Sequence, residues 1–361
     1  MLTYNSNMLH REPYTGQLPA GFAALGAAPY AGLPYAPADE PPAAQLCALL
    51  AASHDIVFYT DHRTLRLAGL FPKAAGDAAY FGFWETANDP VLNQQAFDQL
   101  RAEARARGFQ RVQGPLHFST YFRYRLRLGA APSWGQFDRE PVNPPYYPEL
   151  LAAAGLRPGL TFESRRLRAE TVPAVYRQQA AALGQLEALP FDFIPLNASV
   201  WQAMEDEIFA LIQQVFGQNP AYRAVSRAQF GLLYNVAYAA GLCPHSSVLF
   251  RHRASRRLAA LSLCQPNYQP LALPPGAAPH FERDYPRLPA PRTLLAKTVG
   301  VHPDFRGQGV QALLAAYAMR SFLAHYEDVI FCLMRADNLS LRFTDGLPAE
   351  VADYALFERE T

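Results

Sequence analysis

The amino-acid sequence predicts an α/β fold made of two related domains. Segments with the alternating pattern of β-strands and segments with helical spacing follow one another along the whole chain. The chain has 361 residues, whereas one ordinary domain takes roughly 150. Strands mixed with a few helices recur in both halves, and half of the residues are hydrophobic, so each half can build a core. No internal repeat is visible as plain sequence identity.

Composition and charge argue against several classes of function. The 32 basic residues nearly balance the 31 acidic ones, which leaves a net charge of +1 and no global field that would collect nucleic acid. Met1–Asn7 lacks the basic cluster and apolar run of a secretory signal, and no segment reaches the roughly 18 apolar residues of a membrane span. Without a Cys-x-x-Cys pair, the sequence indicates neither a metal site nor a disulfide framework, and we expect a cytoplasmic protein. The cysteines are Cys47, Cys243, Cys264 and Cys332.

The chain divides into three segments. Residues 1–45 are rich in proline, alanine and glycine and predict an N-terminal arm without regular helix. Residues 46–168 predict an N-terminal domain, and residues 169–361 predict a C-terminal domain. The elements expected in the N-terminal domain are strands at 56–60, 65–71, 79–85, 111–116 and 162–167 and helices at 94–107 and 147–154.

An arginine-rich segment lies in the middle of the N-terminal domain. From Tyr121 to Leu128 arginine alternates with aromatic and leucine residues, and this period of two predicts a strand. Arg123, Arg125 and Arg127 would share one face, which could hold a carboxylate or a phosphate. Because charged runs usually face water, we interpret this face as the solvated side of an exposed strand.

The C-terminal domain begins with helical sequence. Residues 200–216 carry one apolar stripe, and the acidic residues at 205–207 fall away from it, which indicates a solvated helix face. The long Pro-rich stretch at 266–292 predicts a lid or binding loop, since structureless connections of that length are uncommon within a domain. The other expected elements are strands at 258–265, 294–301, 329–334 and 354–358 and helices at 310–323 and 338–343.

The most informative feature is the junction between the strand at 294–301 and the helix that starts at Val310. Pro303 ends the strand, and Gly307 and Gly309 allow a ligand to approach the backbone without a Cβ in the way. The first amides of the helix have no partner within the helix, and the positive end of the helix dipole adds to their attraction for anions. The junction therefore predicts a site for a pyrophosphate group.

Two known phosphate-binding motifs do not fit this loop. No Lys-Ser/Thr follows the glycines, as it would in a P-loop, and no ribose-binding acid is placed as in a Rossmann unit. The loop instead resembles the acyl-CoA motif of the GNAT acyltransferase family, which runs Val-x-Pro-x-x-Arg-x-x-Gly-x-Gly/Ala between a strand and a helix. The matching residues are Val301, Pro303, Arg306 and Gly309, and Gln311 stands in place of the final small residue.

The resemblance implies a donor site for acetyl-CoA or a longer acyl-CoA. The backbone at 308–310 would hold the pyrophosphate, while Val299 and Val301 would pair with the pantetheine arm like an added strand. Gln311 would either crowd the pyrophosphate or donate a hydrogen bond to it. Asn338 matches a family asparagine that contacts the arm, and a helix N-cap is its alternative role. The residues that would surround the donor are Val299, Val301, Arg306, Gly307, Gln308, Gly309, Val310, Gln311 and Asn338.

Further segments are similar to tandem GNAT proteins, in which two such domains share one chain. The resemblance implies that each domain is a mixed, mostly antiparallel sheet flanked by helices. No Arg-x-x-Gly-x-Gly/Ala lies between the strand at 79–85 and the helix at 94–107, so we expect the N-terminal domain to lack an acyl-CoA site. The similar segments are Gly114–Phe118, Asn143–Pro148 with Leu150 and Gly155, and Pro266–Tyr268, and with the glycine loop they cover most of 54–359.

The sequence offers three candidates for catalysis. GNAT enzymes let an amine attack the thioester directly, which needs orientation, a polarised carbonyl and a path for one proton. The strand at 258–265 has no carboxylate where many relatives carry a basic glutamate, and residues 341–345 have no tyrosine where they carry a general acid. Tyr354 and Asp337 are the nearest substitutes, with structural roles as the alternative. Cys264 is either a nucleophile in a two-step transfer or a core residue.

The sequence thus predicts an acyl-CoA-dependent N-acyltransferase that moves an acyl group from a CoA thioester to an amine by direct attack. A fatty-acyl donor with an amino-acid or peptide acceptor is an alternative within that class. The missing base and acid leave open a non-catalytic acyl-CoA-binding protein, and the glycine loop alone leaves open a binding module for another nucleotide. His302 is interpreted as a turn residue, with a base role as the alternative. The expected partner is a small-molecule or peptide amine, with no nucleic acid and no metal.

Overall fold

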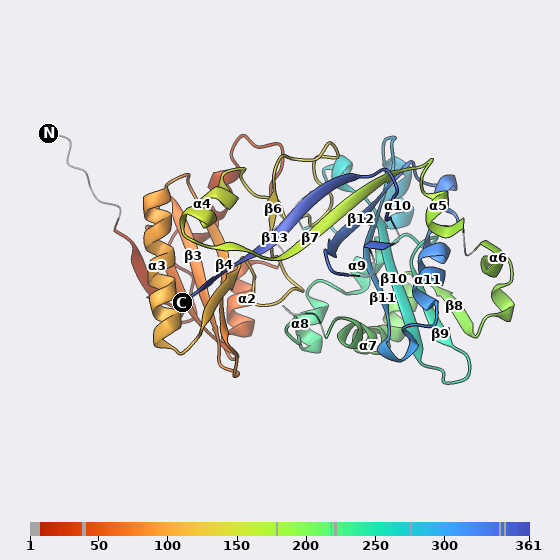
Figure 1. The fold of residues 1–361 in the computed structure, drawn as a ribbon, viewed down its shortest axis with the longest axis horizontal. Helices are drawn as coiled ribbons and strands as arrows, with labels where there is room; N and C mark the ends of the chain where they lie inside the picture. Colours follow the sequence, from red (N-terminus) through yellow and green to blue (C-terminus); the bar gives the residue numbers. More distant parts are fainter. Residues whose placement is uncertain are drawn as a thin grey trace. The chain divides into compact units, whose positions relative to one another are not determined.

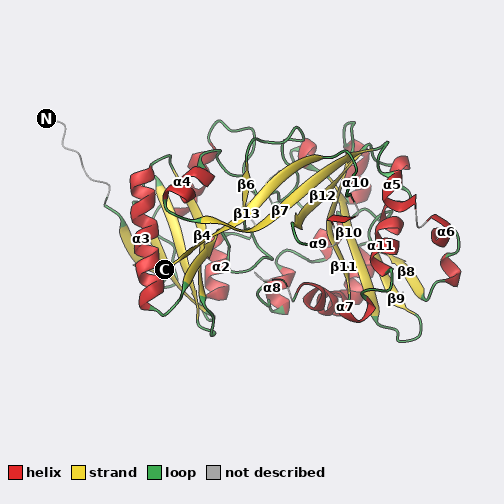
Figure 2. Cartoon of the chain, in the orientation of Figure 1, coloured by secondary structure: helices red, strands yellow, loops and turns green. Residues whose placement is uncertain are grey.

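The computed structural model describes residues 8–37, 41–177, 180–217, 219, 222–274, 276–338, 341–342 and 344–361 (Figures 1 and 2). The chain forms two compact units. Unit 1 comprises Met1–Ala131, Arg139–Thr161 and Asp353–Thr361, and unit 2 comprises Pro132–Asp138 and Phe162–Ala352. Each unit combines a mostly antiparallel sheet with helices, which confirms the predicted α/β class.

The strands of unit 1 follow the order β1–β2–β3–β4–β5–β13. They are β1 (His10–Pro13), β2 (His54–Thr60), β3 (Leu65–Pro72), β4 (Ala78–Thr86), β5 (Arg111–Gly114) and β13 (Glu350–Glu360), and the short β6 (Leu126–Leu128) pairs with β13. Neighbouring strands are antiparallel except β4 and β5, which run parallel. The last strand of the chain, dark blue in Figure 1, therefore joins a sheet whose other strands come from the N-terminal half.

Helix α3 (Pro90–Ala106) packs on the sheet of unit 1 through one apolar face. The Asp89 carboxylate caps the helix by accepting hydrogen bonds at 3.0 Å from the amides of Val91 and Leu92. Beyond the other end, Arg107 pairs with Asp55 at 2.8 Å and lies over the ring of Phe71. The buried residues of the helix are Leu92, Asn93, Ala96, Phe97, Leu100 and Ala104.

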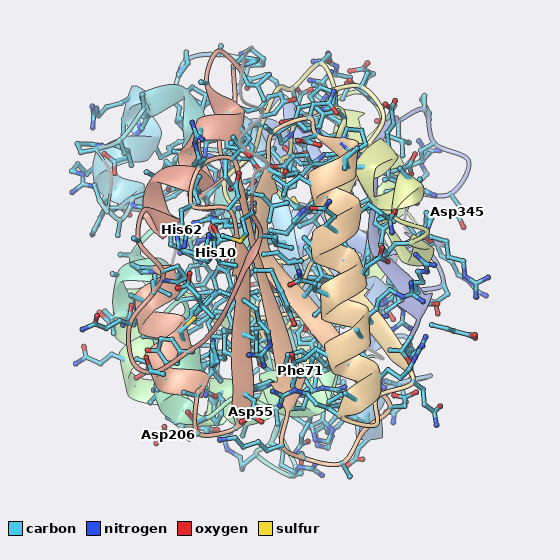
Figure 3. The ribbon with its side chains drawn as sticks, turned by 90° about the vertical axis from the view of Figure 1, so that its left-hand side faces the viewer. His10, Asp55, His62, Phe71, Asp206 and Asp345 are labelled. Atoms are coloured by element: carbon cyan, nitrogen blue, oxygen red, sulfur yellow. The ribbon has the colours of Figure 1, made fainter. Side chains whose placement is uncertain are left out.

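The described part of the segment expected as an N-terminal arm is packed into unit 1. β1 forms an edge strand on β2, and the rings of His10 and His62 lie 5.0 Å apart (Figure 3). Phe22 of α1 (Phe22–Ala27) is buried, with its ring 5.1 Å from that of Phe58. The other α-helices described in this unit are α2 (Ala43–Leu50) and α4 (Tyr147–Ala153).

The strands of unit 2 follow the order β7–β12–β11–β10–β9–β8. They are β7 (Arg157–Arg168, in this unit from Phe162), β8 (Phe191–Pro195), β9 (Val248–His252), β10 (Leu258–Pro266), β11 (Thr293–Val301) and β12 (Asp328–Arg335). Only β11 and β12 run parallel among these neighbours in the described chain. The two units thus share one strand plan, although no repeat is visible in the sequence.

Helices α11 (Val310–Met319) and α7 (Ala198–Phe216) lie on opposite faces of the sheet in unit 2. Val301 of β11 packs in one cluster with α11, whereas a Cβ added to the neighbouring Gly300 would lie 2.3 Å from Val215 of α7. Successive strand residues point to opposite faces, so the two helices enclose β11 between them. The remaining α-helices described in this unit are α5 (Pro173–Tyr176), α6 (Ala180–Leu183), α8 (Arg227–Gly231), α9 (Val236–Ala240) and α10 (Phe281–Asp284).

Most of the expected elements lie where the sequence predicts them, but several do not. The segment at 1–45, expected without regular helix, contains α1 and the start of α2. The Pro-rich stretch at 266–292 contains α10 and short 3-10 helices, so it is not the structureless connection that we expected. The helix expected at 338–343 falls partly outside the described residues. The domain limits expected at 45/46 and 168/169 stay a prediction, and the compact units are divided elsewhere, within β7 and within β13.

The interpretation of the arginine-rich segment was wrong. Only Leu126–Leu128 forms a strand, and a φ of +66° at Arg125 interrupts the expected alternation. Arg123 donates a hydrogen bond at 2.9 Å to Glu85, a carboxylate that is 1% exposed. Arg127 lies 3.6 Å from the buried Glu140. These carboxylates are distant in sequence, which is why the local pattern suggested a solvated face.

Glu85 and Arg123 belong to a buried polar network in unit 1. The Tyr147 hydroxyl donates to the second oxygen of Glu85 at 2.8 Å. Arg123 also donates to the Tyr30 hydroxyl at 2.9 Å, and that hydroxyl donates to the Val142 carbonyl at 3.3 Å. The network joins α4, β4 and the N-terminal segment, so Arg123 has a structural role.

Arg123→Ala is expected to lower the free energy of unfolding by roughly 3–5 kcal/mol, because it leaves the Glu85 charge buried without its ion-pair partner. Urea denaturation measures the change. Arg63→Ala, at an exposed position of the same unit, is the matched control and should stay within about 0.5 kcal/mol of the parent. Equal stability of the two variants would return Arg123 to the solvated face predicted from the sequence.

Candidate functional site

The loop between β11 and α11 leaves its backbone open. Pro303–Phe305 form a short 3-10 helix, and Gly307 and Gly309 follow with φ of +75° and +76°. Apart from the chain neighbours of each glycine, no described residue comes within 4 Å of the position that a Cβ would take. The left-handed conformation explains the glycines, and the open space beside them is available to a ligand.

Helix α11 starts without a side-chain cap. Its N-cap residue is Gly309, which has no side chain to accept from the first amides of the helix. The helix is held in place by Val310, Leu313 and Leu314, whose side chains pack in the core of unit 2. A helix start with uncapped amides attracts anions, and the pyrophosphate site stays a prediction.

Arg306 shapes this loop from within the protein. Its Nε donates to the Val301 carbonyl at 3.1 Å, and its Nη2 donates to the Val215 carbonyl at 3.1 Å. The guanidinium therefore ties the end of β11 to the end of α7. Gln308 donates to the Asp304 carbonyl at 3.0 Å, and Gln311 is half-buried in the first turn of α11.

Strands β11 and β12 separate before the loop. Their parallel ladder runs from Thr293 to Ala296 of β11, after which β11 continues on β10 and β12 continues on β7. The His302 amide donates to Ala259 of β10 at 2.8 Å. Because strand amides alternate in direction, Val299 and Val301 direct theirs to the edge on the side of β12. That edge can accept an extended chain.

One extra residue in β11 coincides with the separation. Thr298 lies opposite Leu263 of β10 and Ala296 lies opposite Cys264, so Lys297 between them is a β-bulge. Ala296 packs toward α11 before the bulge, and Val299 packs toward it afterwards. The bulge therefore shifts by one residue which side chains of β11 face α11, at the point where β11 and β12 separate.

Lys297 faces a carboxylate that sequence reasoning missed. Its Nζ donates to the main-chain oxygen of Asp138 at 2.5 Å and lies 3.7 Å from Oδ2 of the same residue. Gln265, the last polar residue of β10, donates to Oδ2 at 2.7 Å across 127 residues of sequence. A carboxylate thus stands beside the strand whose own sequence contains none.

Asp138 is held by a short segment, Pro132–Asp138, that packs on unit 2. Phe137 is fully buried in one cluster with Leu295 of β11 and Ile330 of β12. Asn267 Nδ2 lies 3.5 Å from the Gln136 carbonyl, the limit of a hydrogen bond. The only signal in the sequence that could have suggested this arrangement is the absence of a carboxylate from the strand at 258–265.

The catalytic roles of Tyr354, Cys264 and Asp337 stay predictions. Tyr354 is fully buried in unit 1, where its hydroxyl donates to Glu140 at 2.5 Å. Cys264 is fully buried, and burial raises the pKa of its thiol to about 12, so it is a core residue. Asp337 is exposed and forms an ion pair with Arg335. Asn338, which follows β12, is also exposed. Its contact with the pantetheine arm stays a prediction.

His302 has the turn role that we preferred. Its Nδ1 accepts a hydrogen bond from the Asp304 amide at 3.2 Å, and Arg257 lies 2.9 Å from its Nε2. Burial, and then the charge of Arg257, lower the pKa of His302 below its usual value. The imidazole is therefore neutral at pH 7 and is occupied in the turn.

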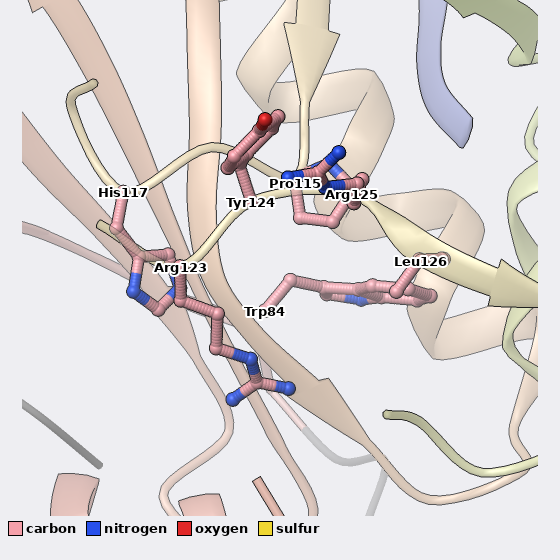
Figure 4. Close-up of a pocket in the computed structure, with 7 residues that line it drawn as sticks. All are labelled: Trp84, Pro115, His117, Arg123, Tyr124, Arg125 and Leu126. Carbon is pink, nitrogen blue, oxygen red and sulfur yellow. The ribbon is translucent and has the colours of Figure 1, made fainter. Parts of the chain in front are cut away.

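The corresponding place in unit 1 is closed. β4 also bulges, with Phe83 at a φ of +50°, but the Leu116 amide donates at 2.7 Å to Phe81 and thereby covers the edge of β4. The Asp89 carboxylate occupies the first amides of α3 and places a negative charge where an anion would bind. A small hollow remains, lined by Trp84, Pro115, His117, Arg123, Tyr124, Arg125 and Leu126 (Figure 4).

Neither a family model nor a curated protein matches this chain by sequence. Three solved structures are similar in fold. A tandem GNAT protein from the clavulanic acid biosynthesis pathway is 13% identical, with 98% of both chains covered and a TM-score of 0.50. A probable N-acyltransferase from Enterococcus faecalis is 8% identical, with 98% of this chain and 72% of that chain covered and a TM-score of 0.52. A GCN5-related glucosamine N-acetyltransferase region of a fungal β-N-acetylglucosaminidase is 12% identical, with 98% and 38% covered and a TM-score of 0.51.

At these identities the likeness shows the fold. The chain has the fold of the GCN5-related N-acetyltransferases, and it has this fold in the tandem form, with one related unit after the other. The predicted resemblance and fold class are confirmed. No helix among the described residues is both long and apolar enough to cross a membrane, and none of their His, Cys, Asp and Glu side chains are grouped to hold a metal ion.

The lowered pKa of His302 predicts a pH dependence. Below about pH 6.5 the unfolded chain takes up a proton that the folded protein refuses, so the free energy of unfolding falls as the pH falls. His302→Asn keeps an acceptor for the Asp304 amide and removes the titrating group. Melting temperatures between pH 7.5 and pH 5 should therefore decline less steeply in the variant, and parallel curves would contradict the assignment.

Proposed function

We propose that the chain is an acyl-CoA-dependent N-acyltransferase and that its donor site lies in unit 2. The observation that carries the proposal is the pairing of an uncapped helix start with an open strand edge in one connection, from β11 to α11. Such a pair suits a ligand that joins a pyrophosphate to an extended amide-containing arm. The names of the similar structures support the same class.

Different groups of unit 2 would bind the pyrophosphate and the pantetheine arm. The amides at 308–310 hold the pyrophosphate, and Gly307 and Gly309 keep side chains out of its way. Val299 and Val301 offer their strand edge to the pantetheine arm. Four residues of strand span about 13 Å from Val301 back to the bulge at Lys297, and the thioester end of the arm would lie there.

When bound, acyl-CoA supplies a thioester whose carbonyl carbon is open to attack by a neutral amine. Unit 2 then has to orient the amine beside the bulge and accept its proton. Unit 1 would take no donor, because its helix start and strand edge are closed. The identity of the acyl group, the amine acceptor and a cytoplasmic location remain predictions.

Two further outcomes stay open in the test. A fatty-acyl donor with an amino-acid or peptide acceptor belongs to the same class and differs only in the thioester preferred. The burial of Tyr354 and Cys264 favours the second possibility, a non-catalytic acyl-CoA-binding protein. Binding measurements and transfer measurements separate these possibilities.

The donor site is tested by thermal unfolding with CoA, acetyl-CoA, a medium-chain and a long-chain acyl-CoA, ATP and NAD. A ligand at a hundred times its dissociation constant adds about 2.7 kcal/mol to stability. We expect a CoA species to raise the melting temperature of the parent and to leave Gly309→Glu unchanged, because the new carboxylate meets the pyrophosphate.

Gly129→Glu is the matched control. Gly129 lies in unit 1 with a φ of +69° and open space beyond it, so the variant introduces the same charge and the same backbone strain away from the site. It should keep the full shift with CoA. No shift of the parent with any CoA species, or a better response to ATP or NAD, would overturn the donor assignment.

Transfer is tested by the release of thiol from each bound thioester in the presence of a mixture of amino acids, small peptides and aliphatic amines. Competition between acetyl-CoA and the longer thioesters identifies the acyl group. Thiol release that requires an amine supports an N-acyltransferase. CoA binding without release would establish the non-catalytic alternative.

A further inference from the structure

A carboxylate, a lysine and a buried amide meet at the bulge of β11. They are Asp138, Lys297 and Gln265, and all three belong to unit 2. We propose that Asp138 is the carboxylate that receives the acceptor's amine and takes up its proton. This inference rests on the proposed function, because it places the acyl thioester at the bulge.

Asp138 lies close to the bulge of β11. Lys297 is the bulged residue itself, and its side chain reaches the main chain of Asp138 at 2.5 Å. Asp138 therefore lies within one lysine side chain of the place where β11 and β12 part. The opposite end of the open edge is the glycine loop, so a donor bound along β11 would present its reactive end toward this carboxylate.

The Asp138 carboxylate is held in a fixed orientation. The amide of Gln265 is 3% exposed and donates to Oδ2 of Asp138 at 2.7 Å, which fixes the carboxylate. Phe137, fully buried beside it, anchors the segment that carries it. The Asp138 side chain is 33% exposed, so a small amine can reach it from solvent. A group that must meet a substrate has to be both held and accessible, and this carboxylate is both.

The Asp138 carboxylate already lies beside a positive charge. The hydrogen bond of Lys297 goes to the main-chain oxygen of Asp138, while its Nζ stays 3.7 Å from Oδ2. The lysine thus fixes the backbone of Asp138 and lies at ion-pair distance from its carboxylate. An incoming primary ammonium has the same chemistry as Nζ, which indicates that the surroundings of Asp138 suit such a group.

The proton balance of the step is complete. Asp138 takes one proton from the ammonium and leaves a neutral amine, whose nitrogen attacks the thioester carbonyl. The C–N bond forms, the C–S bond breaks, and the second proton leaves the nitrogen as the thiolate becomes free CoA thiol. Asp138 then releases its proton to water. No oxidant, reductant or metal is needed.

The test is Asp138→Asn in the full chain, because asparagine keeps an acceptor for Gln265 and cannot take up the proton. Thiol release from the preferred acyl-CoA is measured with the same amine mixture from pH 6 to pH 10. At pH 7 we expect a loss of about 100-fold relative to the parent. With an aliphatic amine, whose pKa is about 10, the loss should shrink about tenfold per pH unit and be gone near about pH 9, because the neutral amine then forms without Asp138.

Asp192→Asn is the matched control, since Asp192 lies on β8 in exposed ion pairs with Arg253 and Arg256. It should follow the parent at every pH, and Asp138→Asn should keep the thermal shift with CoA. If Asp138→Asn loses that shift, Asp138→Glu is compared in its place, and recovery of the rate and of the pH profile supports the inference.

The outcomes separate the inference from the proposed function. Parent and Asp138→Asn rates that stay in a constant ratio close to one would overturn the role of Asp138 and leave the acyltransferase intact. A parent that binds CoA and transfers to no amine would overturn both the transfer reaction and the inference. A parent that binds no CoA would overturn the donor site and, with it, the inference.

Discussion

The open edge of unit 2 depends on one constraint of the parallel sheet. The backbone amides and carbonyls of two strands form hydrogen bonds only where the strands lie next to each other. β11 and β12 share a ladder through Ala296 and then follow different neighbours. Lys297 supplies the extra residue at that point, so β11 keeps its pairing with β10 while its apolar side chains keep facing α11. The strand edge, the glycine loop and the helix start then follow in order along ten or so residues of chain. A single change of register thus opens the strand edge that leads directly into the glycine loop.

The comparison of the two units shows how one strand plan can be kept open or closed. Both units have a bulged strand that pairs in parallel with its neighbour and leads into a helix. In unit 2 the connection is long and ends on Gly309, and in unit 1 it is short and ends on Asp89, which caps α3 with its own carboxylate. A carboxylate at the N-cap meets the same amides that a phosphate would use. The difference between the open helix start of unit 2 and the capped helix start of unit 1 is therefore concentrated in the connection after the bulged strand.

The sequence predicted most of the fold, because strand alternation and helical stripes are local properties. It predicted the glycine loop between β11 and α11 and placed α11 correctly, while the donor site itself stays a prediction. It did not predict the partners of buried charges. Arg123 was assigned to solvent because Glu85 is distant in sequence, and Asp138 was missed because it meets Gln265 only through tertiary packing. Tyr354 and Cys264 were considered for catalysis because burial and the division of the chain into units are not visible in a linear motif.

The place of β13 in unit 1 has a consequence for biosynthesis. The ribosome synthesises β1 to β5 long before it reaches Glu350, the first residue of β13, which pairs with β5. At about 5–20 residues per second this interval lasts on the order of tens of seconds. During it, β5 is the edge of a nearly complete sheet, while β8 to β12 of unit 2 are being synthesised. The N-terminal unit is therefore completed only when the last residues of the chain, Asp353–Thr361, emerge.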